Sequence, residues 1–325
     1  MIKTILLIDG NNIFHKNYHS NKKTSDTDLA IELSAASSLF EFKFYFDKFK
    51  PVLTAIAFDS KGNWRKQYTK SEKAVTRKVY KSNRSENKTK QELEAKKKLN
   101  ETISETADML EKYTKLVVLR EELLEADDLI AGMCHLFGNS EYDIKLLSTD
   151  KDYMQLLRYD NVEIVNPKAG GKVRTLADWN NDAELFMFEK CIRGDGKDNV
   201  RSAYPRVRST KILEAFYDDV KRSNLLNHTF TEVEYDEATD SYPEREYEVN
   251  ALFEENQLLL DLNKQPENIK TLINDVIENE LSRKKVANFV KFLQYASAKE
   301  FNNIVDRGGS FLPFIQNKPK KGRSV

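Results

Sequence analysis

The sequence predicts an α/β fold, in which a mostly parallel central sheet is flanked by helices and a helical C-terminal region follows. Three observations support this prediction. In the first half of the chain, short apolar runs alternate with segments of helical periodicity, as they do in a parallel sheet with helical crossovers. From about residue 182 onward the periodicity is mostly helical. The 325 residues, 40% of them hydrophobic, are enough for one large domain or two smaller ones.

Four buried strands are expected in the first 150 residues. The first, "IKTILLID", ends at Asp9, and the second, "VLTAIAFD", ends at Asp59. "KLVVL" is the third, and "YDIKLLSTD", which ends at Asp150, is the fourth. After them, "NVEIVNPKAGGKVRTL" predicts two short strands around a Gly-Gly turn. The strands that end in an aspartate are the most informative, because they place acids at one edge of the sheet.

Helices are expected between these strands. Residues 29–49 are rich in apolar residues at helical spacing, and "EADDLIAGMCHLF" predicts a helix after the third strand. Another helix is predicted by the spacing of Leu99, Ile103, Ala107 and Leu110. We therefore expect an α/β core at residues 1–180 with a basic insertion at about 61–100. A helical region at 181–307 would follow, and then a basic mobile tail at 308–325.

The formal net charge of zero hides a strong asymmetry along the chain. Residues 61–98 contain fourteen Lys and Arg against four Glu, whereas the segment 231–248 is acidic. Trp64, Tyr68 and Tyr80 are interleaved with the cations of the basic stretch. Cations bind phosphates and aromatic faces stack on unpaired bases, so this stretch suits a nucleic acid. The alternative is a solvated helix face.

Other features narrow the class of protein. No apolar run is long enough to cross a bilayer, and Asp9 interrupts the first one too early for a signal peptide. Cys134 and Cys191 lack metal-like spacing and indicate reduced thiols, so we expect a cytoplasmic protein. Nothing in the sequence requires more than a monomer.

We expect nine carboxylates to lie at the same edge of the sheet. Ligands bind at the carboxyl ends of the strands in an open parallel sheet, and three expected strands end in an aspartate. "EADD" begins a helix directly after another strand, and "STDKD" and "RGDGKDN" add further acids. The set is Asp9, Asp59, Glu125, Asp127, Asp128, Asp150, Asp152, Asp195 and Asp198.

For any single acid of this set, helix capping is the simpler explanation. The set as a whole is different, because so many acids cannot share one edge stably unless cations neutralise them. Carboxylates without His or Cys suit Mg²⁺ or Mn²⁺ better than zinc. Two such ions about 4 Å apart, one activating water and one stabilising the leaving oxygen, form a phosphodiesterase centre.

Six stretches in order over about residues 5–200 resemble the 5′ nucleases, the family that includes flap endonucleases and bacterial 5′–3′ exonuclease domains. They are "LLIDGNN", "AFDS", "WRK" with "YKSNR", "EADDLIA", "LLSTDKDYMQL" and "RGDGKDN". The resemblance implies a PIN-like 5′-nuclease fold and two magnesium ions, for which Mn²⁺ can substitute, held by the nine acids. It also implies that the basic stretch at about 61–100 is a helical arch, in which Lys81 and Arg84 contact the scissile phosphate. The helical region at 181–307 would then bind duplex.

The implied activity is hydrolysis of phosphodiesters near 5′ ends, flaps or forks of DNA and RNA–DNA duplexes. It covers 5′–3′ exonuclease, flap endonuclease and ribonuclease H activity, with RNA-primer removal during DNA replication as the role. Asp9, Asp59, Glu125, Asp127 and Asp150 are assigned to the first ion, and Asp128, Asp152, Asp195 and Asp198 to the second. The competing interpretation is a structure-specific nucleic-acid binding protein that does not cut. All nine acids are present, which favours the enzyme.

The chain departs from the family after "RGDGKDN". Many members continue with a Gly-Val/Ile-Gly hairpin that grips duplex, whereas "VRSAYPRVRSTKILEAF" follows here. Its cations are candidates for phosphate contacts, with a surface helix bearing salt bridges as the alternative. The full set of expected nucleic-acid contacts is Arg65, Lys66, Arg77, Lys78, Tyr80, Lys81, Arg84, Arg201, Arg206, Arg208 and Lys211. In the tail, "FLPF" is either a docking peptide for a sliding clamp or single-strand binding protein, or packs against the last helix.

Overall fold

A computed structural model describes residues 3–23, 25–76, 78–86, 88–233 and 240–317. The chain divides into two compact units. We call the first the sheet unit, which comprises Met1–Gly62, Lys88–Thr175 and Lys270–Val325, and the second the helical unit, which comprises Asn63–Asn87 and Leu176–Ile269. The units do not follow chain order as expected. Most of the predicted arch belongs with the helical unit, and the C-terminal helices belong with the sheet unit, because contacts distant in sequence decide the grouping.

The sheet unit contains the mostly parallel sheet that the sequence predicts. Its strand order is β3-β2-β1-β4-β5-β6. Five strands are parallel to their neighbours, and only β6 is antiparallel. The strands are β1 (Lys3–Asp9), β2 (Leu53–Ala57), β3 (Val117–Leu119), β4 (Tyr142–Leu147), β5 (Val162–Asn166) and β6 (Lys172–Val173).

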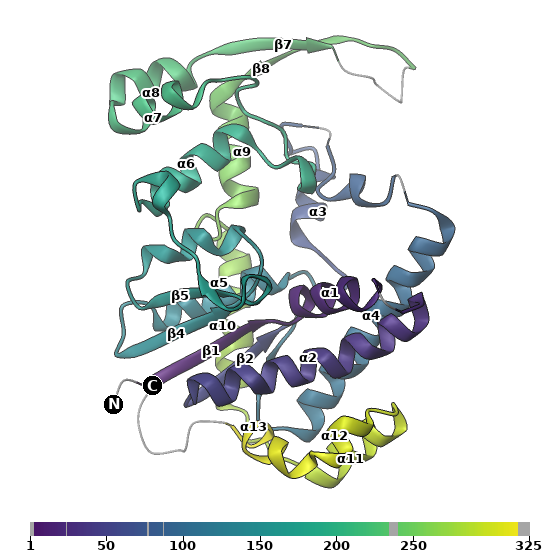
Figure 1. The fold of residues 1–325 in the computed structure, drawn as a ribbon. Helices are drawn as coiled ribbons and strands as arrows, with labels where there is room; N and C mark the ends of the chain where they lie inside the picture. The colour runs from purple at the N-terminus through teal and green to yellow at the C-terminus, as the bar shows by residue number, and fades with distance from the viewer. Residues whose placement is uncertain (1–2, 24, 77, 87, 234–239, 318–325) are drawn as a thin grey trace. The chain divides into compact units, whose positions relative to one another are not determined.

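Helices cover both faces of this sheet, which explains why β1 is a continuous apolar run. On one face, Leu6 and Ile8 belong to a core shared with α1 (Gly10–Asn21), α2 (Thr27–Phe49) and α4 (Lys90–Tyr113). The other face packs against α5 (Ala126–Phe137), beside which lies α10 (Glu267–Ser282). Figure 1 shows α1, α2 and α4 on their side of the strands.

Gly132 explains how closely α5 and α10 approach each other. A Cβ atom at Gly132 would lie 2.4 Å from Ile273 and 2.7 Å from Ile277, so only glycine fits there. The contact joins helix residues about 140 positions apart, and it holds the C-terminal part of the chain on the sheet.

The last elements of the sheet unit are α11 (Phe289–Ala298), α12 (Asn302–Asp306), η6 (Gly308–Phe311) and α13 (Leu312–Ile315). Phe311 and Phe314 are fully buried, and their rings contact Phe40 and Phe46 of α2. The prediction of a mobile tail is therefore wrong for residues 308–317, and "FLPF" packs in the core instead of offering a docking peptide. Residues 318–325, which carry the basic part of the predicted tail, lie outside the described residues.

The helical unit is built mainly from short helices and one hairpin. Its longer elements are α3 (Trp64–Thr69), α6 (Ala183–Arg193), α7 (Ser209–Tyr217), α8 (Asp219–Leu226) and α9 (Val249–Leu260). In the acidic segment, β7 (Thr229–Val233) and β8 (Glu244–Glu248) form an antiparallel hairpin. The 3-10 turns η1 (Ser82–Ser85), η4 (Ala177–Trp179) and η5 (Gly196–Asp198) complete the unit. The predicted arch is thus helical only in part.

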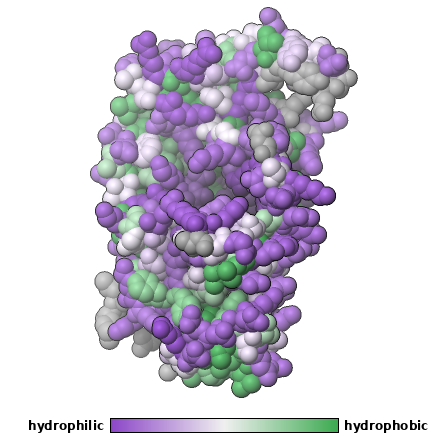
Figure 2. Space-filling model, turned by 45° about the vertical axis from the view of Figure 1, so that its right-hand side comes forward, coloured by the Kyte–Doolittle hydropathy of each residue, from purple (hydrophilic) through white to green (hydrophobic). Residues whose placement is uncertain are grey.

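Two further 3-10 turns, η2 (Asp152–Arg158) and η3 (Pro167–Ala169), lie in the sheet unit. Hydrophilic side chains cover most of the face drawn in Figure 2, as the 32% of charged residues leads one to expect. Among the helices that the structure describes, none is long and apolar enough to span a membrane.

Candidate metal site and phosphate-contact residues

Seven of the nine predicted acids belong to the sheet unit, at the carboxyl ends of its parallel strands. Asp9 is the last residue of β1, Asp59 follows β2 and Asp150 follows β4. Asp59 and Asp150 both act electrostatically on Asp9, and Asp127 acts on nearby Tyr153 together with these three acids. Parallel neighbours therefore bring the acids to one edge, as the sequence predicts.

Asp9 is one of three buried acids of this group, with 6% of the residue exposed, against 9% for Glu125 and 0% for Asp128. One of its oxygens accepts the backbone N–H of Asn12 at 3.0 Å. The other accepts the hydroxyls of Ser148 and Tyr153, each at 3.1 Å. Burial and, after it, the charge of Asp59 raise the pKa of Asp9 from 3.8 to about 7. The ionised carboxylate is thus disfavoured here until a positive charge is added.

Helix capping, the alternative explanation for single acids, applies to several members of the set: Asp9, Glu125 and Asp195 are the N-caps of α1, α5 and η5. Asp59 accepts the backbone N–H of Ala126 at 2.9 Å, at the first residue of α5. Asp128 accepts the backbone N–H of Glu125 at 3.0 Å in a capping box. Each bond uses one oxygen lone pair of its carboxylate, so capping by itself does not exclude metal binding. Asp128, however, is fully buried.

Asparagines of "DGNN" tie the loops of the acidic edge together. Asn11 accepts the backbone N–H of Asp59 at 3.0 Å through its side-chain oxygen. Asn12 accepts the backbone N–H and the hydroxyl of Thr149 at 2.9 and 2.8 Å. Sequence reasoning missed these residues and also Ser148 and Tyr153, although all four stand inside the motif stretches. Polar residues next to the acids in those stretches were the available signal.

The acids Asp195 and Asp198 belong to the helical unit. Gly194 precedes them with φ +67, and a Cβ there would lie 2.3 Å from the carbonyl oxygen of Arg201, so the first glycine of "GDGKDN" is required sterically. Lys190 lies 3.7 Å from Asp195. The sheet unit alone collects seven acids, and a site shared by all nine stays a prediction.

Asp198 is surrounded by residues of the predicted arch. Its carboxylate accepts the hydroxyl of Tyr80 at 2.9 Å, pairs with Arg84, and lies 3.8 Å from the Lys81 ammonium. Burial alone would raise the pKa of Asp198, but the charges of Lys81 and Arg84 outweigh it and hold the pKa below its usual value. The two cations predicted to contact the scissile phosphate thus lie beside a predicted metal ligand.

The predicted nucleic-acid contacts differ in how exposed they are. Lys81 is half-buried, and an exposed group consists of Lys66, Lys78, Arg84, Arg206, Arg208 and Lys211. Three others are buried: Arg65 is 1% exposed, Tyr80 2% and Arg201 7%. Arg77 lies outside the described residues.

The three buried residues have structural roles, so the prediction that they contact nucleic acid is corrected. Arg65 donates to the Leu259 carbonyl at 2.8 Å, with its guanidinium over the ring of Trp64. Tyr80 donates to Asp198 as described above. Arg201 lies 4.0 Å above the ring of Tyr247 and pairs with Glu232. The buried cations, and the buried ring of Tyr80, have no exposed surface to offer a phosphate or a base.

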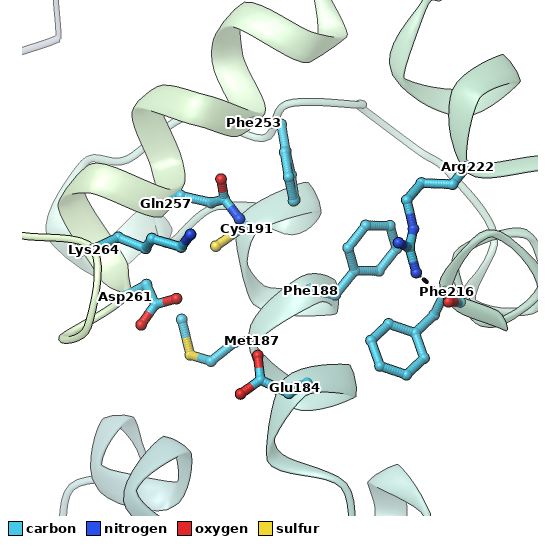
Figure 3. A pocket seen from close by; sticks show the side chains of 10 residues that line it. All are labelled: Glu184, Met187, Phe188, Cys191, Phe216, Arg222, Phe253, Gln257, Asp261 and Lys264. Carbon is cyan, nitrogen blue, oxygen red and sulfur yellow. Dashed lines mark hydrogen bonds between the residues drawn. The ribbon is translucent and has the colours of Figure 1, made fainter. Parts of the chain in front are cut away.

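A pocket of about 250 Å³ in the helical unit is distinct from these residues. Figure 3 shows the apolar side chains of Met187, Phe188 and Phe253 along it, and Arg222 donating to the Phe216 carbonyl. None of the predicted site residues lines it. The pocket is therefore no part of the predicted metal site.

The donor set of the sheet unit fits a hard divalent cation. Its seven acids offer oxygen atoms only, and the sequence brings no His or Cys into the set. Oxygen ligands favour Mg²⁺ or Mn²⁺ over zinc, for which nitrogen and sulfur ligands are usual.

The doubly covered parallel sheet and its acidic carboxyl edge define an α/β protein whose donor set suits divalent metal ions. Residues 4–186 match the family model described as the 5′–3′ exonuclease N-terminal, resolvase-like domain. The chain belongs to this 5′–3′ exonuclease family.

Two curated relatives and several solved structures are similar to the chain. Ribonuclease H of Enterobacteria phage T4 is 29% identical over 189 residues, which cover 53% of the chain and 54% of that protein. DNA polymerase I of Caldicellulosiruptor bescii is 23% identical over 234 residues, or 67% of the chain and 26% of the polymerase. The chain thus spans about half of the first relative and a quarter of the second.

The structural neighbours share the fold. The T5 D15 protein co-crystallised with metal ions has a TM-score of 0.61 at 20% identity, covering 86% of the chain and 100% of its own. A pseudo-enzyme–product complex of the T5 D15 flap endonuclease with DNA and metal ions has the same TM-score and identity, and covers 86% of the chain and 99% of its own.

Proposed function

We propose that the protein is a metal-dependent 5′ nuclease. Its substrates are DNA and RNA–DNA duplexes with 5′ ends, flaps or forks, which it cuts near the 5′ end or junction. The activities are those of a 5′–3′ exonuclease, a flap endonuclease and a ribonuclease H that removes RNA primers. One observation supports this above all: Asp9, Asp59, Asp127 and Asp150 interact electrostatically around the carboxyl edge of a parallel sheet, in a member of the 5′–3′ exonuclease family.

The proposed cofactor is a pair of Mg²⁺ ions. Bound ions supply an activated water for attack and offset charge on the scissile phosphate. The first ion is assigned to Asp9, Asp59, Glu125, Asp127 and Asp150, and the second to Asp128, Asp152, Asp195 and Asp198. The pKa of Asp9, raised to about 7 by burial and neighbouring acids, supports a cation at this edge.

The side chains of the protein then have separate tasks. Asn12, Ser148 and Tyr153 orient the Asp9 carboxylate through hydrogen bonds. Lys81 and Arg84 stabilise negative charge that develops on the phosphate. The products carry a 5′-phosphate and a 3′-hydroxyl.

Cleavage of a 5′-labelled flap duplex and of an RNA-primed duplex tests the proposal. We expect short labelled products with Mg²⁺ and none with Ca²⁺, because Ca²⁺ accepts looser oxygen geometry than in-line attack requires. The Asp127→Asn variant should lose cleavage in Mg²⁺ while it still binds the junction. Tight junction binding without cleavage in either Mg²⁺ or Mn²⁺ would favour the non-cutting binding protein.

Duplex binding is assigned to the exposed cations Arg206, Arg208 and Lys211. Arg208 stands at the start of α7, where backbone N–H groups also favour an anion. Arg208→Ala should weaken duplex binding in Ca²⁺ several-fold and reduce the slope of log K against log salt by about 1. The control is Lys284→Ala, which removes one exposed cation from the sheet unit. Equal effects of the two substitutions would contradict a specific contact at Arg208.

A further inference from the structure

Two segments of the helical unit, residues 79–84 and 195–199, are joined by an interlock of hydrogen bonds. The backbone N–H of Lys81 donates to the Asp198 carbonyl at 2.8 Å. The side-chain amide of Asn83 donates to the Gly196 carbonyl at 2.8 Å. The amide of Asn199 donates to the Val79 carbonyl at 2.9 Å. These bonds connect residues more than 110 positions apart.

The Asn199 amide makes a second bond, to the hydroxyl of Ser82 at 3.1 Å. Its two acceptors, the Val79 carbonyl and the Ser82 hydroxyl, stand on either side of Lys81 in the chain. Lys81 itself has φ +56, a left-handed backbone conformation that a lysine rarely adopts without support. The Asn199 amide therefore brackets the strained residue.

The side chains carried by the bracketed segment are the two cations of the proposed mechanism. Lys81 and Arg84 both point to the carboxylate of Asp198, which is 6% exposed. A change in the backbone at Lys81 would move both cations relative to that carboxylate. Asn199 is uncharged, and its amide binds the Val79 carbonyl and the Ser82 hydroxyl instead of either cation. Its effect on Lys81 and Arg84 would therefore be transmitted through the segment that carries them.

We propose that Asn199 is a positioning residue for the cleavage step, which acts by holding residues 79–82 so that Lys81 and Arg84 are oriented toward the phosphate. This proposal rests on the proposed nuclease function. It adds to that function a residue that carries no charge and binds neither metal nor substrate.

The test is Asn199→Gly, which removes both amide bonds and keeps the backbone relaxed, because Asn199 has φ +58 and glycine adopts this conformation freely. The matched control is Asn181→Gly in the same unit, also at φ +58 and exposed. Single-turnover cleavage of a flap duplex is measured in Mg²⁺, and the dissociation constant for the same duplex in Ca²⁺. We expect Asn199→Gly to lower the rate about tenfold or more with a small change in binding, and Asn181→Gly to change neither.

A double-mutant cycle separates positioning from general destabilisation. If Asn199 acts through the two cations, Asn199→Gly should cause almost no further loss of rate in the background of Lys81→Ala with Arg84→Ala. Additive losses in that background would overturn the proposal. So would an unchanged rate of the single variant Asn199→Gly.

Hydrogen exchange of the Lys81 amide gives a readout that needs no catalysis. We expect faster exchange in Asn199→Gly than in the wild type and in Asn181→Gly, since the bond to the Asp198 carbonyl is loosened. Unchanged exchange would overturn the proposal even if cleavage fell. Failure of the wild type to cleave would be seen before any substitution, and would overturn the proposed function and the positioning role with it.

Discussion

Asp9→Asn is expected to lower the cleavage rate about 10³-fold or more, because it removes a charge that no other group at the site replaces. Asparagine has the shape of aspartate, and its oxygen can still accept the N–H of Asn12 or a hydroxyl. The buried position is thus filled as before. The loss should therefore arise in metal binding and in the chemical step while the fold is retained.

Three measurements check this prediction: single-turnover rates in Mg²⁺, the rise in melting temperature on adding Mn²⁺, and circular dichroism for the fold. The metal-dependent rise should shrink in Asp9→Asn. Asp160→Asn, the same substitution at an exposed acid of the sheet unit, serves as control and should resemble the wild type. If Asp9→Asn kept more than a tenth of the wild-type rate, the assignment of Asp9 to the metal site would be contradicted.

Arg65→Met is expected to destabilise the protein by about 3 kcal/mol, because it removes a buried guanidinium and leaves its hydrogen-bond partner unsatisfied. The guanidinium donates to the Leu259 carbonyl of α9 and lies over the rings of Trp64 and Tyr80 at 4.6 and 5.9 Å. Methionine fills much of the space but leaves the carbonyl without this donor. The urea midpoint of the transition that involves the helical unit should fall.

The neighbouring residue supplies the control. Lys66→Met makes the same kind of change at an exposed position of α3, and surface changes of this kind usually alter stability by less than about 0.5 kcal/mol. It should instead weaken nucleic-acid binding, because Lys66 remains among the exposed predicted contacts. If Arg65→Met left stability unchanged and weakened binding as Lys66→Met does, the structural role of Arg65 would be contradicted.

The contrast between Arg65 and Lys66 marks a limit of sequence reasoning. Both cations stand side by side in "WRK", and charge pattern alone gave them the same role. Burial separates them, because one lies against a carbonyl 194 positions away. The same holds for Tyr80, whose hydroxyl binds Asp198 at a separation of 118 positions. No local pattern encodes such a contact.

The sequence by itself determined the α/β class, the parallel strands β1 to β4 and the acids at their carboxyl ends. It could do so because strand and helix periodicity are local, and because parallel strands force their ends to one edge. Only the tertiary structure decided that residues 308–317 pack in the core, that most of the predicted arch belongs to the helical unit, and that Asn199 brackets Lys81. These features depend on which distant surfaces bury one another. That choice is made by the free energy of the whole packed chain, which no short window of sequence contains.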